Sequence, residues 1–532
     1  MIDLRIVVPA GAGWLAAILL LPLPGWMLPV AIAFWVAAVL ALGLARLSGR
    51  SWLVVVGVSC AAVALIATAA FAASGARRPA LLERTRALSD ATVVTTQTVT
   101  RASRYFAATL TRDDGAAMSV PVLVFGAAPR SRVDIGATLS VSGSLVTTTP
   151  SDEDSYLVFA RGPARTIAPP PWYLSWANRL RGGLAAAAAS LPGDGGALLP
   201  GLAIGDTVAV SPTLSAAMKT SSLSHLTAVS GANCAVVIGL FLLVGKALGL
   251  RRGVRIAAAL VVLVGFVALV TPQPSVLRSA IMAALVLGAL AGGRPVGGLP
   301  VVGVAVLVML TFDPWLALNF GFALSVLATA GLMVLSGPLA QRLERWLPRW
   351  LALLVAVPLA AQLACQSVLI LLTPSLPVYG VLANTLAEPA SPAATVLGLV
   401  ACIALPVVPP IGHVLAAVAW VPSAWIAAVA TFFAGLPGAR LPWPGGLPGA
   451  AVLAVVTALL LVVALGRLTR RARGILAAAL VVSLLASLAF AAVFPAADPQ
   501  AAGPHAVELR VPELRAVGSG SFGRPVDRGA PG

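Results

Sequence analysis

The sequence predicts a polytopic α-helical membrane protein of about 13 spans, with a small, OB-like β-barrel inserted after the first spans. Hydrophobic residues make up 59% of the 532 residues and charged residues only 10%. A water-soluble domain carries roughly a quarter charged residues. Uncharged apolar stretches of about 20 residues, the length that crosses a bilayer, recur along the chain. The composition therefore excludes a soluble globular protein.

The formal net charge of +17 says little about partners. It comes almost wholly from arginine, because Lys219 and Lys246 are the only lysines. Abundant Arg, Ala, Gly and Pro are also typical of a GC-rich genome, so the charge alone does not identify a polyanionic partner. The four cysteines lie in or beside apolar stretches and the three histidines lie far apart. We therefore expect no disulfide framework, no metal site and no cofactor.

Composition divides the chain into five expected parts. They are N-terminal transmembrane helices over 1–73, an extracytoplasmic β domain over 74–171, an interfacial helix and connector over 172–222, a second transmembrane domain over 223–494, and a polar tail over 495–532. The first apolar run is taken as a span and not as a cleaved signal, because no small-residue cleavage site leads into a soluble region.

The part over 74–171 has the composition of a soluble domain. Its apolar runs shorten, and Thr, Ser and charges of both signs increase. Five segments rich in Val and Thr, separated by turn signals, predict short strands over 92–100, 105–112, 118–125, 138–147 and 156–160. Such a series predicts a small barrel or sandwich, with an OB-like barrel as one option.

The helix predicted over 172–191 has two interpretations. Its tryptophans and arginines beside an alanine run are typical of a helix at the membrane surface. Alternatively, it packs on the membrane domain. The arginine clusters at 46–50, 246–255, 342–349 and 467–473 all fall on one side if the predicted spans alternate. The positive-inside rule then predicts that these clusters lie in the cytoplasm and that the barrel lies outside it.

Polar residues within the apolar runs are candidates for lining a hydrated path across the membrane. One stretch contributes Lys219, His225, Ser230, Gly231 and Asn233. His225 and Asn233 share a helical face if this stretch is one helix, whereas a break at Ser230 and Gly231 would expose N–H groups that bind anions. The alternative is that these small residues only pack helices closely.

Four further polar residues interrupt later apolar runs. They are Arg278, Asn319, Asn384 and Glu388. Arg278 either lines the path or extends to the lipid headgroups. Asn384 and Glu388 lie in a proline-rich stretch that predicts a re-entrant or broken helix beside a cavity. Since Glu388 would repel phosphate, we expect it to pair with an arginine or to cap a broken helix.

The predicted barrel carries a candidate site for single-stranded DNA. Arg101, Arg104, Tyr105 and Arg112 combine cations with an aromatic ring, and Phe106 adjoins them. Proteins bind single strands with this composition, through phosphate contacts and base stacking. The alternative is an ordinary solvated strand face.

Several stretches, in one order, resemble the ComEC family, the membrane channel of bacterial DNA uptake. They are residues 191–206, Ser-His-Leu-Thr-Ala-Val-Ser-Gly-Ala-Asn over 224–233, 274–282 with 293–295, 313–325 and 377–384. The insert is also similar, since family members carry an extracytoplasmic OB-like domain after their first spans. The resemblance implies a channel that passes single-stranded DNA into the cytoplasm during natural transformation, in contact with membrane lipid.

Two departures from the family limit this resemblance. The family's common Ser-Gly-Leu-His is Ser-Gly-Ala-Asn here, so a role of that histidine does not carry over to Asn233. Many members end in a metallo-β-lactamase-like domain with a His-x-His-x-Asp-His metal cluster, whereas 495–532 contains only His505. We therefore expect no enzyme activity and no catalytic residue in this chain, and either a separate nuclease as partner or a chain that is a truncated member of the family.

The sequence has no Walker-type nucleotide-binding motif, so the energy for transport must come from elsewhere. The resemblance implies a cytoplasmic helicase or translocase and a DNA receptor protein as partners. The sequence does not decide whether the chain forms a homo-oligomer. One rival function is a small-molecule transporter or exporter, which would show inverted repeats that we do not find. Another is an intramembrane hydrolase with His225 as base and Ser230 as nucleophile, although their spacing aligns them poorly and no carboxylate is expected to orient the imidazole.

Overall fold

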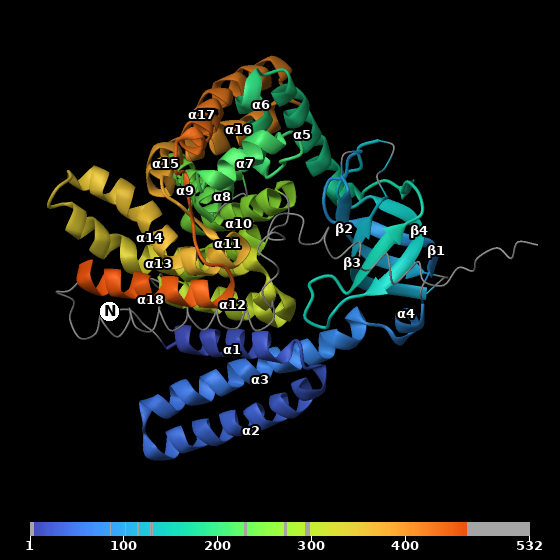
Figure 1. Cartoon of the computed structure of the whole chain (residues 1–532), viewed down its shortest axis with the longest axis vertical. Helices are drawn as coiled ribbons and strands as arrows, with labels where there is room; N and C mark the ends of the chain where they lie inside the picture. Colours follow the sequence, from blue (N-terminus) through green and yellow to red (C-terminus); the bar gives the residue numbers. More distant parts are fainter. Residues whose placement is uncertain are drawn as a thin grey trace, which may run out of the picture. The chain divides into compact units, whose positions relative to one another are not determined.

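The computed structural model describes residues 5–464, apart from 86, 102, 114–115, 128, 130, 228–230, 271–273 and 293–297. Two compact units divide the chain, Met1–Cys365 with Pro377–Arg440, and Gln366–Leu376 with Leu441–Gly532. The barrel and all candidate sites below belong to the first unit (Figure 1).

Helices form most of the described chain. Before the barrel come α1 (Val7–Leu20), α2 (Pro24–Ser48), α3 (Ser51–Arg77) and the short α4 (Ala80–Arg84). After it come α5 (Trp172–Ala189), α6 (Gly193–Ile204), α7 (Pro212–Thr220), α8 (Ser224–Thr227), α9 (Gly231–Ala247), α10 (Arg252–Leu269), α11 (Pro274–Ala291) and α12 (Leu299–Phe312). The last are η1 (Pro314–Leu318), α13 (Phe320–Leu343), α14 (Arg349–Leu372), α15 (Gly380–Ala387), η2 (Glu388–Ala390), α16 (Ser391–Ala404), α17 (Pro409–Gly435) and α18 (Gly446–Ala464), with the short strands β7 (Ser375–Pro377) and β8 (Arg440–Pro442) between them.

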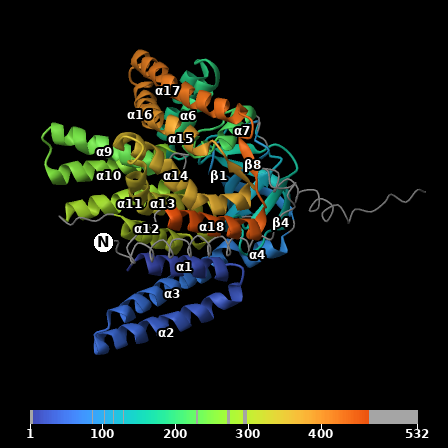
Figure 2. The same cartoon turned by 60° about the vertical axis from the view of Figure 1, so that its left-hand side comes forward.

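The helices confirm a multi-pass membrane protein. In the part of the chain that the structure describes, seven helical segments are long and apolar enough to cross a bilayer. They are Pro24–Ser48, Ser51–Arg77, Arg252–Leu269, Phe320–Leu343, Arg349–Leu372, Gly380–Ala404 and Pro409–Gly435. The other apolar helices are shorter, so these lengths do not show the predicted total of about 13 spans. The long helices α2 and α3 lie side by side, as Figure 2 shows.

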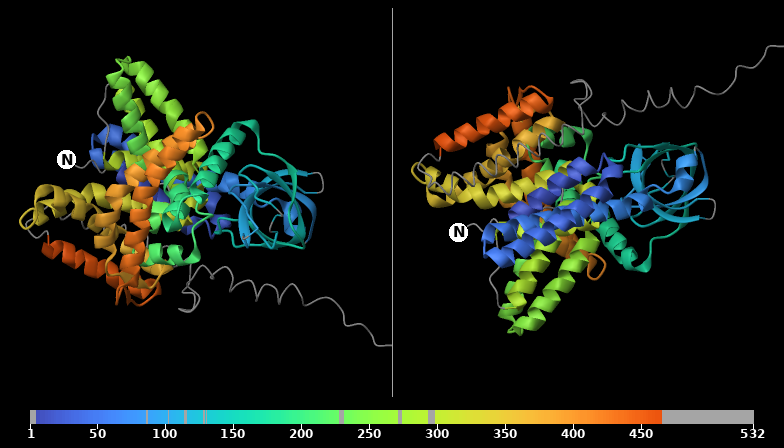
Figure 3. Two further views of the ribbon diagram at one scale, coloured as in Figure 1. Left: turned by 90° about the horizontal axis from the view of Figure 1, so that it is seen from above. Right: turned by 90° about the horizontal axis from the view of Figure 1, so that it is seen from below.

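The insert is a small β-barrel with two neighbouring strands in parallel. Its strands are β1 (Ala87–Thr95), β2 (Tyr105–Asp113), β3 (Ala116–Phe125), β4 (Thr138–Thr147), β5 (Tyr156–Ala160) and β6 (Arg165–Ala168). The strand order is β1-β2-β3-β5-β4-β6, and β1 also pairs with β4, which closes five strands into a ring (Figure 3). Strands β3 and β5 run parallel and the other neighbours antiparallel. The predicted small barrel is therefore confirmed.

Alternating side chains form the barrel core. Phe106, Leu110, Val122, Leu139 and Val158 all point inward and are buried. This period of two arises because successive side chains of a strand lie on opposite faces.

One glycine is required where β4 meets β5. A Cβ atom at Gly143 would lie 2.2 Å from the carbonyl oxygen of Phe159, much closer than any real contact. Only glycine therefore allows this approach of the two backbones.

The first strand lies earlier in the chain than predicted. The prediction placed it over 92–100, whereas β1 begins at Ala87 and ends at Thr95. Asp90 has a φ of 53°, and the register of β1 against β4 shifts between Leu88 and Ala91. The start of the strand lies before this bulge, whereas the Val- and Thr-rich stretch that predicts the strand lies after it. The described residues between Thr95 and Tyr105 instead form the β1–β2 loop.

Helix α5 packs on the helical part of the first unit. It contacts α6, α10 and α16, and it buries Ala177, Arg181 and Leu184. Trp172 and Tyr173 at its beginning are exposed. One side of the helix is thus covered by protein and its beginning is exposed, so both interpretations of this helix stay predictions.

Candidate functional site

Three aromatic rings lie in a row across neighbouring strands of the barrel. Tyr105 of β2 pairs with Phe125 of β3, and Phe125 pairs with Phe159 of β5. The ring centroids of Tyr105 and Phe125 are 5.7 Å apart, and those of Phe125 and Phe159 are 5.2 Å apart in a stacked arrangement. Tyr105 is 41% exposed. We call these three residues the aromatic ladder.

The alternation of the strands places the ladder outside the barrel. Phe106, Val124 and Val158 adjoin the ladder residues in the chain and belong to the barrel core. Their neighbours Tyr105 and Phe159 therefore face outward. Phe106 cannot stack on a base, because it is 1% exposed. The sequence analysis missed Phe125 and Phe159, since only the register of three strands brings them beside Tyr105.

The predicted barrel arginines lie at two places. Arg101 and Arg104 are exposed in the β1–β2 loop, and Arg104 directly precedes Tyr105. The backbone of Arg112 pairs with Thr92 near the other end of β2, and its side chain lies outside the described residues. Arg104 therefore lies close to the exposed end of the ladder, Tyr105. The backbone of Arg112 lies near the other end of β2.

The β4–β5 loop, residues 148–155, contacts η1 and the residue that follows it. The indole Nε1 of Trp315 donates a hydrogen bond to the carbonyl oxygen of Pro150 at 2.9 Å. The amide of Asn319 donates to Oε2 of Glu153 at 2.8 Å. Asn319 also caps α13, because its Oδ1 accepts the backbone N–H of Phe322 at 2.9 Å. The structure therefore places this predicted channel residue in a contact between barrel and helices.

Charged groups surround the same contact. The guanidinium of Arg77 lies 4.0 Å from the ring centroid of Trp315 and 3.8 Å from Oδ1 of Asp313. Burial raises the pKa of Asp313, while Arg77 lowers it. Burial, together with the charge of Glu153, raises the pKa of Asp154 to about 6. Asp154 therefore changes its charge close to neutral pH.

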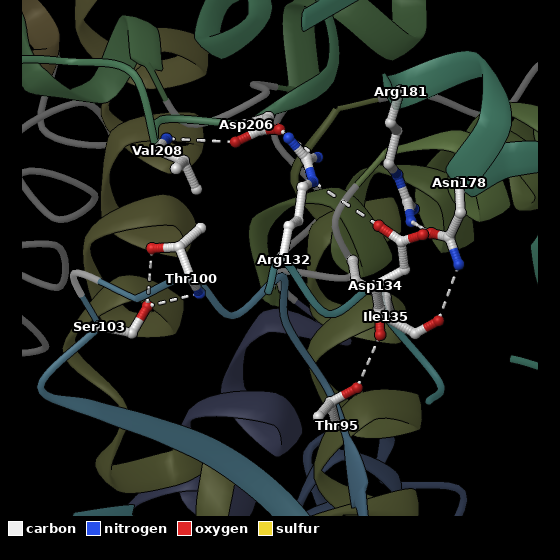
Figure 4. Close-up of polar contacts among 10 residues, drawn as sticks. All are labelled: Thr95, Thr100, Ser103, Arg132, Asp134, Ile135, Asn178, Arg181, Asp206 and Val208. Carbon is white, nitrogen blue, oxygen red and sulfur yellow. Dashed lines mark hydrogen bonds and ion pairs between the residues drawn. The ribbon is translucent and has the colours of Figure 1, made fainter. Parts of the chain in front are cut away.

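The described residues of the loop between β3 and β4 make a second contact with the helices (Figure 4). Arg132 in this loop forms an ion pair with Asp206, which follows α6, at 3.2 Å between Nη2 and Oδ2. Its Nε lies 3.6 Å from Oδ1 of Asp134. Oδ1 of Asp206 accepts the backbone N–H of Val208 at 3.1 Å. One arginine is therefore held between two carboxylates.

A buried pair on α5 supports this second contact. Nδ2 of Asn178 donates to the carbonyl oxygen of Ile135 at 2.9 Å, and its Oδ1 accepts from Nη1 of Arg181 at 2.7 Å. Nε of Arg181 donates to the carbonyl oxygen of Leu269 in α10 at 2.7 Å. Burial lowers the pKa of Arg181, and the charge of Asp206 opposes this shift. Asn178 thus links the barrel loop to α10 through Arg181.

Two adjoining cavities run along α5 at this contact. The first, of about 420 Å³, is lined by Arg132, Asp134, Pro170, Ser175, Asn178, Arg179 and Gly182. The second, of about 390 Å³, is lined by Arg132, Gly182, Ala185, Ala186, Pro200, Asp206, Val208 and Ala209. They share Arg132 and Gly182, and we call them together the α5 groove.

The stretch around His225 contains a helix break. Helix α7 ends at Thr220 and α8 begins at Ser224, and Ser222 between them has a φ of 61°, a conformation uncommon for serine. Lys219 is exposed in the last turn of α7, and Gly231 is the first residue of α9. Ser230 lies outside the described residues, so the predicted break there is not described.

The structure brings His225, Glu388 and Asn384 together. Nε2 of His225 lies 3.8 Å from Oε1 of Glu388, and its Nδ1 lies 3.2 Å from the carbonyl oxygen of Ser222. Asn384 donates to the same carbonyl oxygen at 3.3 Å. The Oδ1 of Asn384 is buried without a hydrogen-bond partner among the described residues. Glu388 begins the 3₁₀ turn η2, which lies inside the helical segment Gly380–Ala404, so the predicted break is a local tightening of the helix and not an end of it.

Two expectations about this cluster were wrong. Among the described residues, the charged partner of Glu388 is His225 and not an arginine. A carboxylate does lie beside His225, although 3.8 Å is longer than a hydrogen bond. Sequence spacing could not show either contact, because α8 and η2 are far apart in the chain.

Arg278 is enclosed by protein. It is 4% exposed, and its Nε and Nη2 donate to Oγ of Ser325 at 3.1 and 2.8 Å. No carboxylate lies within ion-pair distance of Arg278 in the described part of the chain. The alternative in which Arg278 extends to the headgroups is therefore wrong. Asn233 is also buried, in α9, which packs against the helix of Arg278.

Comparison with known proteins identifies one similarity. A family model described as Competence protein matches residues 202–470, half of the chain. The match includes every predicted channel residue and begins after the barrel. No curated protein and no solved structure matches the chain.

Proposed function

Because the chain belongs to the competence protein family, we propose that it is a channel subunit that passes single-stranded DNA inward across the bacterial cytoplasmic membrane during natural transformation. A strand carries one phosphate per nucleotide and cannot cross hydrocarbon, so it needs a hydrated path lined by hydrogen-bond donors. In this proposal the shorter apolar helices also cross the membrane, and the barrel lies outside the cytoplasm.

The aromatic ladder is the observation that carries the nucleic-acid part of this proposal. Its exposed end, Tyr105, adjoins Arg104 and the β1–β2 loop, which also contains Arg101. OB-type barrels bind oligonucleotides on strands 2 and 3 and the loop between strands 1 and 2. Stacked aromatic rings bind bases without sequence preference, which suits a protein that takes up any DNA.

The buried polar residues of the helices support a path in the membrane. Arg278 supplies a cation without a carboxylate partner among the described residues, and buried Asn233 lies in a neighbouring helix. Intramembrane cations and amides of this kind usually mark the route of a substrate. We propose that Arg278 contacts the phosphates of the moving strand.

The proposed transport requires partners. The chain has no Walker-type motif, so a cytoplasmic helicase or translocase would pull the strand. A receptor would deliver the DNA, and a separate nuclease would degrade the other strand. The channel subunit itself would carry out no hydrolysis, and it would work alone or as a homo-oligomer.

Deletion of the chain tests the proposal. Cells that lack it should bind labelled DNA at the surface but fail to bring it into the cytoplasm, and a plasmid copy should restore uptake. Normal uptake into the cytoplasm of the deletion strain would contradict the proposal.

One observation favours a second candidate, the transport of a small solute. The helix interruption between α7 and α8 lies beside the 3₁₀ turn η2, where Glu388 approaches His225, and small-solute transporters place their binding sites at helix interruptions. Purified chain in liposomes separates the two functions. A DNA channel should admit oligonucleotides when a motor or a trap is provided, whereas a solute transporter should exclude them under all conditions.

A further inference from the structure

We propose that the α5 groove holds the incoming DNA strand beside the barrel, and that a phosphate replaces Asp206 as the partner of Arg132. This inference rests on the proposed function and adds a strand-binding site outside the aromatic ladder. It involves Arg132 and Arg179, neither of which the sequence motifs single out.

The groove follows one face of α5. Ser175, Asn178, Arg179, Gly182 and Ala185 line it, and their spacing of three or four residues places them on one side of the helix. The groove is therefore continuous along about three helical turns, roughly 15 Å at 1.5 Å per residue. A linear polymer fits such a shape better than a compact ligand does.

The chemistry of the groove changes along its length. The first cavity presents two cations, Arg132 and Arg179, with one carboxylate, Asp134, and the hydroxyl of Ser175. The second shares Arg132 and adds the carboxylate of Asp206, and its other side chains are apolar, among them Ala185, Ala186 and Val208. A nucleic acid strand has the same two components, a charged backbone and flat apolar base faces. Phosphate therefore suits the first cavity, and a base suits the second.

Gly182 lies at the junction of the two cavities. A Cβ atom added to Gly182 would meet no other atom within 4 Å, and the same holds for its neighbour Gly183. Close helix packing therefore does not explain the glycine at 182. The missing side chain leaves the groove open from one cavity to the other.

Arg132 is placed to exchange partners. Its side chain is 36% exposed, and the five N–H donors of a guanidinium are more than its two carboxylate contacts require. Phosphate accepts two parallel hydrogen bonds from arginine, so it can compete with Asp206. Asp206 would keep the N–H of Val208 as a partner after the exchange. Loss of the arginine should therefore weaken strand binding, and loss of the competing carboxylate should strengthen it.

A matched pair of glycine variants tests the groove. The full chain in nanodiscs is titrated with labelled oligothymidylate, and binding is followed by fluorescence anisotropy. Gly182→Leu fills the groove without changing charge and should raise Kd about tenfold, the effect of losing one stacked base or one phosphate contact. Gly183→Leu, next to it on the same helix, should leave Kd unchanged. Equal Kd values for the two variants would overturn the proposal.

Charge variants test the exchange of partners. Arg132→Ala should raise Kd and reduce the slope of log Kd against log salt by about 0.7, the value for one phosphate contact on a single strand. Asp206→Asn should lower Kd about threefold, since it removes the competitor of the phosphate. Arg161→Ala, an exposed arginine of the barrel outside the groove, should change neither. If Arg132→Ala and Asp206→Asn change Kd in the same direction, the proposed exchange of partners is contradicted. An ion pair with a purely structural role would lose the same contact in both variants.

The two proposals fail in different ways. If the wild-type chain binds no oligothymidylate, the proposed function fails and the groove proposal fails with it. If the wild-type chain binds and the deletion strain lacks uptake, but the groove variants behave like their controls, only the groove proposal fails.

Discussion

Arg132 and Asp206 form an ion pair, with Nη2 3.2 Å from Oδ2, that joins the barrel to the turn after α6. A second contact joins the barrel to η1, where Trp315 donates to the carbonyl oxygen of Pro150. The barrel is thus held by two of its own loops, and the contacts described for these loops do not involve the aromatic ladder. The following predictions test what each of these contacts and sites contributes.

The first prediction concerns Asn178. The substitution Asn178→Ala removes the contact to Ile135 and leaves buried Arg181 with one acceptor fewer, so it should destabilise the protein by about 2–4 kcal/mol. Thermal unfolding of the purified chain in detergent measures this effect. Arg179→Ala, an exposed neighbour on the same helix, should change stability by less than about 0.5 kcal/mol. Equal melting temperatures of the two variants would show that the buried pair contributes nothing.

The second prediction concerns pH. The pKa of Asp154 in the folded chain, about 6, lies above the ordinary aspartate value of 3.8. The folded state therefore binds this proton more tightly than the unfolded state, and the resulting stabilisation is present below pH 3.8 and is lost as the pH rises through 6. Asp154→Asn should stabilise the chain by about 1 kcal/mol at pH 7.5, a value reduced for the partial exposure of the side chain, and much less at pH 4. Melting curves at the two pH values check this, and an equal gain at both would contradict it.

The third prediction concerns the aromatic ladder. Tyr105→Ala should weaken the binding of oligothymidylate by about tenfold, because a base stacked on an aromatic side chain contributes about 1–3 kcal/mol. Phe125→Leu should weaken binding as well, since Phe125 supports the ring of Tyr105. Ile167→Ala, an exposed apolar residue of β6 outside the ladder, is the matched control. Should all three variants bind alike, the ladder has no role in binding DNA.

The fourth prediction concerns Arg278. Arg278→Met keeps much of the side-chain volume and removes the charge, so it should reduce DNA uptake at least about tenfold if the cation contacts phosphate. Ser325→Ala removes the hydrogen-bond partner but keeps the cation, and it should reduce uptake less. Arg345→Ala, an exposed arginine that follows α13, should leave uptake normal. Immunoblots of membranes measure the amount of each variant, and a parallel loss of protein in Arg278→Met would assign Arg278 to stability instead.

Local patterns in the sequence explain what could be predicted. Segments rich in Val and Thr between turn signals predict the strands of the barrel, and uncharged apolar runs predict the membrane helices. The prediction failed where a local irregularity hides the pattern, as Asp90 does at the bulge in β1. It also misjudged Arg278, because a lone arginine near the start of an apolar run looks the same whether lipid or protein surrounds it.

By itself, the sequence determined that the protein belongs in a membrane, that it carries a small barrel and that its motifs resemble a DNA-uptake family, since composition, periodicity and ordered motifs are properties of neighbouring residues. Only the tertiary structure decided which distant residues meet. Strand register places Phe125 and Phe159 beside Tyr105, and helix packing places Glu388 beside His225. Folding of two loops brings Arg132 to Asp206, 74 residues away in the chain. Such contacts depend on how whole elements pack, and the local pattern of one element contains no information about the position of another.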